Sequence, residues 1–112
     1  MALPRSYEAF KRGHSRIWQA YDRLGGMLHE AGPLDEKSRE LVKLGISIGG
    51  KLEGAVHSHT ARALKAGATA DEIRHVVLLA LTTVGFPSMM AALTWVEDVL
   101  RKAEPRPRRV GR

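Results

Sequence analysis

The stretch KLEGAVHSHTARAL, residues 51–64, decides the fold prediction, because it combines a helical apolar pattern with two closely spaced histidines. Leu52, Val56, His59 and Ala63 recur at spacings of three and four, which places them on one face of a helix. Gly67 follows as a residue suited to the left-handed conformation that ends helices. The sequence therefore predicts a helix over residues 52–66 and places any chemistry of this chain on it.

Four further helices are predicted around this segment, over residues 6–29, 36–50 and 70–84 and from Phe86 onward, with no apolar periodicity after Ala103. Apolar residues recur at helical spacing in each of them. Thr69 and Glu72 have the spacing of a capping box at the start of the fourth helix. No stretch alternates apolar and polar residues as a strand does, and no internal repeat is present. The fold class predicted is all-α with about five helices.

The net charge of +6 belongs almost entirely to the C-terminal end of the chain, since residues 101–112 carry +5 of it. Residues 104–112 lack apolar periodicity, which predicts a basic disordered tail after a helical domain over residues 1–103. The segment 64–77 resembles a helix-turn-helix corner, but its second helix opens with Asp71 and Glu72, a poor surface for phosphates. We therefore expect no specific nucleic-acid partner.

The chain has no cysteine, which excludes disulfides, thiolate metal ligands and a catalytic thiol. The first residues lack the apolar core of a signal peptide, and we expect a cytoplasmic protein. The longest uncharged run, residues 76–96, contains the sequence Gly85-Phe86-Pro87-Ser88. Such a break is typical of two core helices and not of one membrane span, so no membrane association is expected.

The predicted helices over residues 36–50 and 70–84 are apolar around most of their circumference. A chain of 112 residues has too little other surface to cover both of them. This pattern predicts an obligate homo-oligomer with interfaces that resemble a divided domain core.

Several segments in the same order and spacing resemble the carboxymuconolactone decarboxylase family, which includes the alkylhydroperoxidase D-like proteins. They are LDEKSRELV at 34–42, residues 49–59, HTARAL at 59–64, GATADEI at 67–73 and VGFP at 84–87. The resemblance covers about residues 15–102. It implies an alkylhydroperoxidase D-like helical bundle that assembles as a trimer or hexamer.

The redox branch of that family has a Cys-x-x-Cys pair followed by three residues and then a histidine, and it has a glutamate on the preceding helix. The matching positions here are Leu52, Ala55, His59 and Glu40. The acid/base partners are kept and both thiols are lost, so the dithiol route of peroxide reduction is chemically impossible. The decarboxylase branch also lacks the thiols and acts without metal or organic cofactor on a lactone that bears carboxylates. It is the nearer chemical precedent, and we expect no cofactor.

His59 and Glu40 are the predicted catalytic residues. A lone histidine on an apolar helix face is more often a hydrogen-bonded core residue, and a lone glutamate is more often a solvated helix charge. Together, at positions that match the family, they suggest a pair that lines a pocket. A carboxylate bonded to one imidazole nitrogen fixes the tautomer and raises the basicity of the other nitrogen. Such a pair can move a proton to or from carbon.

Three further residues are candidates for substrate binding, each with a structural alternative. Arg39 and Arg62 have the guanidinium geometry that binds carboxylates, but such arginines are often solvated or bridge subunits. His57 is expected to form an exposed pair with Glu53, or to reach the pocket of a neighbouring subunit. His57 and His59 diverge by about 200° on a helix, so no metal site is predicted.

These observations favour a cofactor-free small-molecule enzyme that decarboxylates or isomerises a small carboxylate or lactone. The alternatives are a non-catalytic oligomeric binding protein that lost its dithiol, and an antioxidant of alkylhydroperoxidase or peroxiredoxin type that depends on a partner's thiol. A pocket filled by Leu52 would favour the binding protein. The sequence specifies neither the substrate nor the number of subunits.

Overall fold

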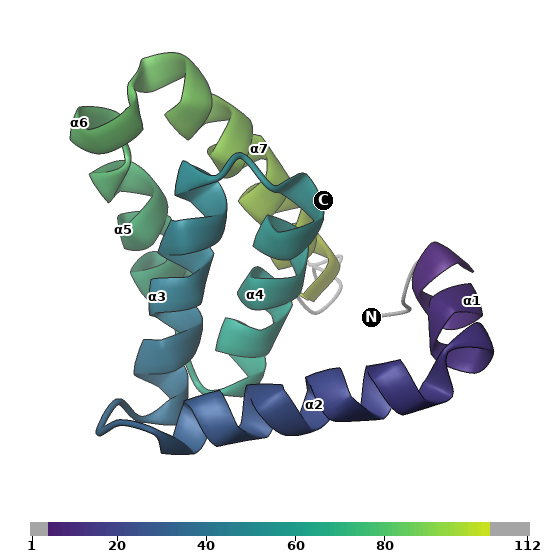
Figure 1. Cartoon of the computed structure of the whole chain (residues 1–112). Helices are drawn as coiled ribbons and strands as arrows, with labels where there is room; N and C mark the ends of the chain where they lie inside the picture. The colour runs from purple at the N-terminus through teal and green to yellow at the C-terminus, as the bar shows by residue number, and fades with distance from the viewer. Residues whose placement is uncertain (1–4, 104–112) are drawn as a thin grey trace, which may run out of the picture. The chain divides into compact units, whose positions relative to one another are not determined.

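The computed structural model describes residues 5–103, and these residues form α-helices and no strand (Figure 1). The all-α prediction is therefore confirmed. The chain separates into two compact units, Met1–Glu36 and Lys37–Arg112. The predicted basic tail over residues 104–112 lies outside the described residues. The helices are α1 (Arg5–Gly13), α2 (Ser15–Glu30), α3 (Glu36–Gly49), α4 (Glu53–Lys65), α5 (Ala70–Leu79), α6 (Leu81–Val84) and α7 (Phe86–Ala103).

The first unit consists of α1 and α2, so the prediction of one helix over residues 6–29 is wrong at His14. The backbone of His14 leaves the helical region, with φ −135° and ψ 53°. The break lets α1 turn back on α2, where the rings of Tyr7 and Trp18 lie 6.2 Å apart in an edge-on arrangement. Lys11 Nζ lies 5.5 Å from the centroid of the same Trp18 ring. These contacts hold α1 against the start of α2.

The second unit contains the hydrophobic core. Helix α7 packs against α4, α5 and α6, which makes it the central helix of this unit (Figure 1). Helix α3 joins the core through Leu44 and Ile48. The fully buried side chains come from four different helices, so no helix pair carries the core alone. The core residues are Leu44, Ile48, Val56, Ala63, Ala68, Ile73, Val77, Ala80, Met89, Ala92, Val96 and Leu100.

The end of α4 and the start of α5 follow the predicted local chemistry. Gly67 is left-handed with φ 99°, and the N–H of Ala68 donates to the Ala63 carbonyl at 2.9 Å. The Thr69 hydroxyl accepts from the N–H of Glu72 at 3.0 Å, and the Glu72 carboxylate accepts from the N–H of Thr69 at 2.9 Å. The capping box is confirmed. The Thr69 backbone bond and the Lys37 ammonium hold the pKa of Glu72 below its usual value.

The predicted fourth helix over residues 70–84 is interrupted, because α5 ends at Leu79 and α6 begins at Leu81. Gly85 then adopts φ 95°, a conformation that favours glycine, and α7 opens at Phe86 as predicted. The chain thus turns inside its longest uncharged run. Within residues 5–103, no helix is both long and apolar enough to cross a membrane.

Several large apolar side chains of the second unit stay exposed in the single chain. Val42 and Ile46 project from α3, Leu52 precedes α4, and five more lie around the α5–α6–α7 corner. The two helices predicted to need cover on several sides are therefore only partly covered within this chain. This agrees with the expectation of a homo-oligomer, which stays a prediction. The side chains at that corner are Leu78, Leu79, Leu81, Phe86 and Met90.

A bidentate ion pair joins α5 to α7. Arg74 Nε and Nη2 donate to the two carboxylate oxygens of Glu97 at 2.7 and 2.9 Å. These bonds, together with the charge of Arg74, lower the pKa of Glu97, although partial burial opposes the shift. The folded chain therefore gains stability from this pair above the pKa of an unfolded glutamate, about 4.3, and loses it as the pH falls through the lower folded value.

We expect Arg74→Met to lower the free energy of unfolding by about 1 kcal/mol at pH 7, discounted because the arginine is partly exposed. The difference from the unsubstituted chain should shrink below about pH 4, where Glu97 becomes protonated. Urea denaturation at pH 7 and at pH 3 measures both quantities. Arg101→Met, which removes the exposed pair of Arg101 with Asp98 on α7, is the control and should cost less than about 0.5 kcal/mol. If Arg74→Met lowers the free energy of unfolding by the same amount at both pH values, the stabilisation does not come from the ion pair with Glu97.

Candidate active site

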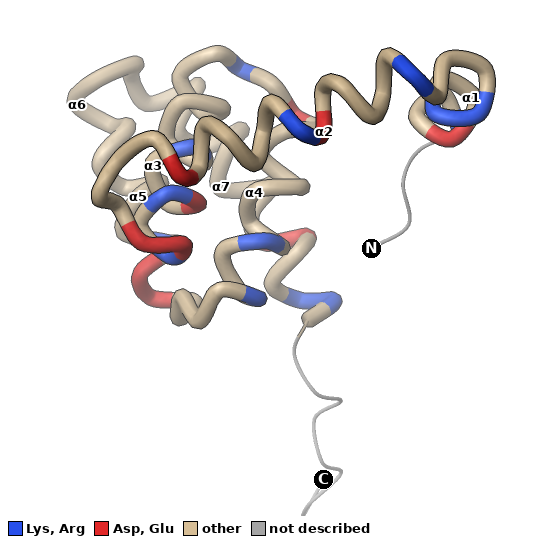
Figure 2. Tube along the Cα trace, turned by 60° about the horizontal axis from the view of Figure 1, so that its bottom comes forward, with Lys and Arg blue, Asp and Glu red and all other residues tan. Residues whose placement is uncertain are grey.

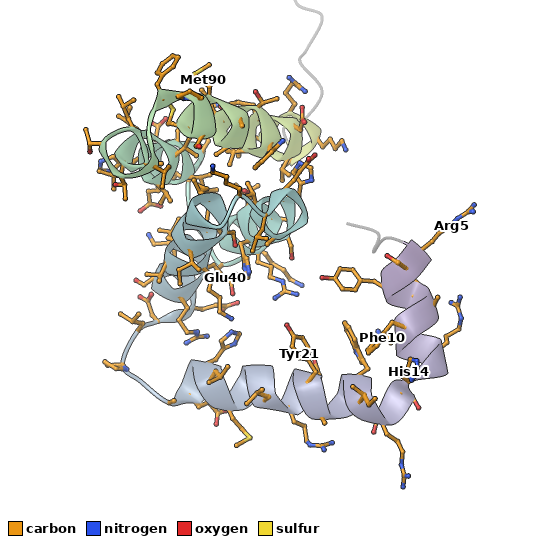
Figure 3. The ribbon with its side chains drawn as sticks, turned by 45° about the horizontal axis from the view of Figure 1, so that its top comes forward. Arg5, Phe10, His14, Tyr21, Glu40 and Met90 are labelled. Atoms are coloured by element: carbon orange, nitrogen blue, oxygen red, sulfur yellow. The ribbon has the colours of Figure 1, made fainter. Side chains whose placement is uncertain are left out.

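Glu40 of α3 and His59 of α4 form a hydrogen-bonded pair in the second unit. The Nδ1 atom of His59 lies 2.8 Å from Oε1 of Glu40. The Glu40 side chain is 5% exposed and the His59 side chain is 17% exposed. Glu40 projects from α3 in Figure 3. The two residues singled out from the sequence are thus brought together although nineteen positions separate them.

The connection between α3 and α4 sets the two helices side by side (Figure 1). Helix α3 ends in a tight turn in which the N–H groups of Lys51 and Leu52 donate to the carbonyls of Ile48 and Ser47, both at 3.0 Å. Lys51 occupies the left-handed position of this turn, with φ 58°, where glycine is the usual residue. The turn reverses the chain within three residues and so brings the buried side of α3 against α4.

The geometry assigns different roles to the two nitrogens of His59. A carboxylate only accepts hydrogen bonds, so Nδ1 carries the hydrogen that points to Glu40. In the neutral imidazole Nε2 is then left with a lone pair and can take a proton. The adjacent carboxylate stabilises the positive ring that results.

The buried hydroxyl groups near the core do not take part in this pair. Thr60 Oγ1 donates to the Val56 carbonyl at 2.7 Å, and Ser47 Oγ donates to the Lys43 carbonyl at 2.8 Å. Each hydroxyl is satisfied by its own helix, in the back-bonding geometry common for serine and threonine. The polar chemistry of the site therefore rests on Glu40 and His59.

His57 does not form the predicted exposed pair with Glu53. Its Nε2 atom is buried and has no hydrogen-bond partner among residues 5–103. Glu53 is exposed in the first turn of α4. The residue is half-buried, and its position on α4 is about 100° from the buried Val56, on the flank of the core-facing side. The sequence carried no signal for this burial beyond that angle.

The two predicted arginines lie in different settings. Arg39 is partly buried on α3, next to Glu40 in the chain, and Arg62 is exposed in the last turn of α4. Arg62 stands three residues after His59, which places the two on neighbouring positions of one helix face. Leu52 is 54% exposed and packs back on Gly50. Of the two arginines, Arg62 lies on the same helix as His59.

Metal ligation gains no support from the arrangement of acidic and histidine side chains. Within the described part of the chain, no three His, Cys, Asp or Glu side chains are grouped so that they could hold a metal ion. On α4, His57 and His59 lie on opposite sides of the residues that face the core, so their side chains point apart.

The sequence model of the carboxymuconolactone decarboxylase family matches residues 17–98, from α2 to near the end of α7. The chain belongs to the carboxymuconolactone decarboxylase family. The resemblance noted in the sequence is thereby confirmed, and Glu40 and His59 lie inside the matched region of this family member. No curated protein sequence matches the chain.

A solved structure supports the same fold. The crystal structure of a carboxymuconolactone decarboxylase family protein from Legionella pneumophila, in its apo form, superposes with a TM-score of 0.77. The superposition covers 88% of each chain at 21% sequence identity. At this identity the similarity shows the shared helical fold. The family member described here differs from the redox branch at positions 52 and 55, where it has leucine and alanine.

Proposed function

We propose that this family member is a cofactor-free enzyme that decarboxylates or isomerises a small carboxylate or lactone. The observation that carries the proposal is the buried Glu40 carboxylate that accepts from Nδ1 of His59 at 2.8 Å. Both side chains are largely withdrawn from water, and the Glu40 carboxylate holds the His59 ring in one tautomer. The two residues are therefore arranged as a proton-transfer pair. The membership of the decarboxylase family favours the same chemistry.

In the isomerisation, the Nε2 atom of His59 takes a proton from a carbon next to a carbonyl or an unsaturated carboxylate. The electron pair of the broken C–H bond moves into that conjugated system, and the protonated ring returns a proton to another carbon. Glu40 stabilises the imidazolium between the two steps. In the decarboxylation, Nε2 of His59 first takes a proton from solvent. The C–CO₂⁻ bond then breaks, its electron pair moves into the conjugated system as CO₂ leaves, and His59 delivers the proton to the carbon that lost CO₂.

Arg62 is the residue we assign to a carboxylate of the substrate. Its exposed guanidinium lies one helical turn from His59, so an anion bound there would place its neighbouring carbons near the imidazole. A substrate with two acidic groups, or a lactone with one carboxylate, fits this spacing. We expect the active form to be a homo-oligomer, a trimer or hexamer, as the family implies.

The test is a panel of small carboxylated lactones and unsaturated dicarboxylates incubated with the protein in D₂O. Proton NMR then follows the loss of carbon-bound hydrogen, and a CO₂ assay follows decarboxylation. We expect at least one compound to exchange or lose CO₂ far above its rate without protein. Binding of panel compounds by calorimetry without any reaction would favour the oligomeric binding protein instead.

A further inference from the structure

Helix α2 carries a stripe of large apolar side chains that nothing in its own unit covers. The stripe, which we call the α2 seam, consists of Ile17, Tyr21, Leu24 and Leu28 at spacings of four, three and four. These side chains are between 49% and 68% exposed, and no residue of α1 or α2 is buried. Tyr21 projects outward from the helix in Figure 3. The alternating spacing is that of a seam between paired helices.

The charged residues of α2 lie away from this seam. With about 100° between successive residues, Arg16, Asp22, Arg23 and Glu30 all lie more than about 100° from its centre. Figure 2 shows the charged positions along α2 as short coloured segments separated by uncharged stretches. The seam therefore offers no cations for a nucleic acid and no charge that would repel a copy of itself.

The side chains of α2 are also arranged symmetrically about the bond between residues 22 and 23. Large apolar residues stand at equal distances on both sides of that point, and small residues stand between them. A helix turned end over end about this point presents the same pattern again. The mirrored pairs are Tyr21 with Leu24, Ala20 with Gly25, Trp18 with Met27 and Ile17 with Leu28.

We propose that α2 pairs antiparallel with α2 of a second copy of the chain, about a two-fold axis at residues 22–23. Ile17 then packs on Leu28 of the partner subunit, and Tyr21 packs on Leu24 of the partner subunit. Beside the seam, the geometry places each large side chain next to a small one. Trp18 lies beside Gly25 of the partner subunit, and Met27 lies beside Ala20 of the partner subunit.

A second copy fits better than other occupants for two physical reasons. The first unit has 36 residues, none of its described residues 5–36 is buried, and chains below about 40 residues seldom hold a fold without external support. A two-fold contact uses one patch on both partners, so it requires the self-complementary pattern that α2 has. The two-fold axis is compatible with a hexamer made of three dimers, and it is incompatible with a simple trimer.

The experiment uses the absence of cysteine from the 112 residues, since introduced thiols are then the only ones in this chain. We expect Ile17→Cys/Leu28→Cys to oxidise to a covalent dimer of twice the 12.3 kDa chain mass on a non-reducing gel. Within one helix these positions are about 16 Å apart, too far for an internal disulfide. A chain that carries only one of the two substitutions should not form a covalent dimer, because an antiparallel pair holds the two copies of one position at opposite ends of the paired helices.

Gln19→Cys/Glu30→Cys is the matched control, with the same separation of eleven residues on the far side of α2. Ala20→Cys/Met27→Cys tests the flank of the seam and avoids the loss of a seam residue, so it should also give a covalent dimer. Light scattering on the unsubstituted chain should give an even number of subunits. A monomer or trimer by light scattering, or equal cross-linking of the control pair, would overturn the proposal.

Discussion

His59→Gln is expected to lower the turnover of the substrate by about 10²–10⁴-fold, the range typical of a lost general acid or base. Glutamine has nearly the size of the imidazole and can donate to Glu40, but it cannot take up a proton near neutral pH. The fold should therefore be kept while proton transfer is lost. Steady-state rates on the compound identified in D₂O give the comparison.

Two control substitutions make this result specific. His75→Gln removes an exposed histidine of α5 and should leave turnover unchanged. Glu40→Gln keeps an acceptor for Nδ1–H but removes the charge that stabilises the imidazolium, so it should lower turnover less than His59→Gln. If His59→Gln turns over substrate as fast as the unsubstituted chain, His59 is a core residue and the assigned chemistry is wrong.

His59→Leu is expected to lower the free energy of unfolding by about 3 kcal/mol, because it leaves the buried Glu40 carboxylate without its partner. For a domain of this size, whose total stability is on the order of 5–15 kcal/mol, such a loss is large. The double variant Glu40→Leu/His59→Leu removes both polar groups. It should regain most or all of the lost stability, because apolar pairs often replace buried ion pairs without cost.

Urea denaturation of His59→Leu, Glu40→Leu and the double variant measures this double-mutant cycle. A double variant that is stable but inactive would mean that the polar pair serves chemistry and not the fold. The opposite result, a double variant less stable than His59→Leu alone, would assign the pair a structural role and favour the non-catalytic alternative.

The parts of the fold that depend on local chemistry are readable in the sequence. Gly67 takes the left-handed position that its lack of a side chain permits, and Thr69 and Glu72 satisfy each other's backbone groups as a capping box. The pairing of Glu40 with His59 came from their positions in the family resemblance. Periodicity alone placed His59 on an apolar face and left its partner open.

The features that depend on tertiary contacts were not readable. The break at His14 is held by contacts of Trp18 with α1, which no helical periodicity reports. The interruption after Leu79 lies within a continuous apolar run, where the pattern has no boundary. His57 was expected in solvent because Glu53 stands at pairing distance, and packing on the flank of α4 decides otherwise.

Nitrogen-15 NMR of the His59 side chain is the sharpest test of the proton-transfer pair, and it needs no substrate. In the neutral ring we expect hydrogen on Nδ1, bonded to Glu40, and a lone pair on Nε2. Glu40→Leu should remove this preference by removing the acceptor. If the hydrogen lies on Nε2 in the unsubstituted chain, or if Glu40→Leu leaves the spectrum unchanged, Glu40 does not prepare His59 as a base and the proposed function fails.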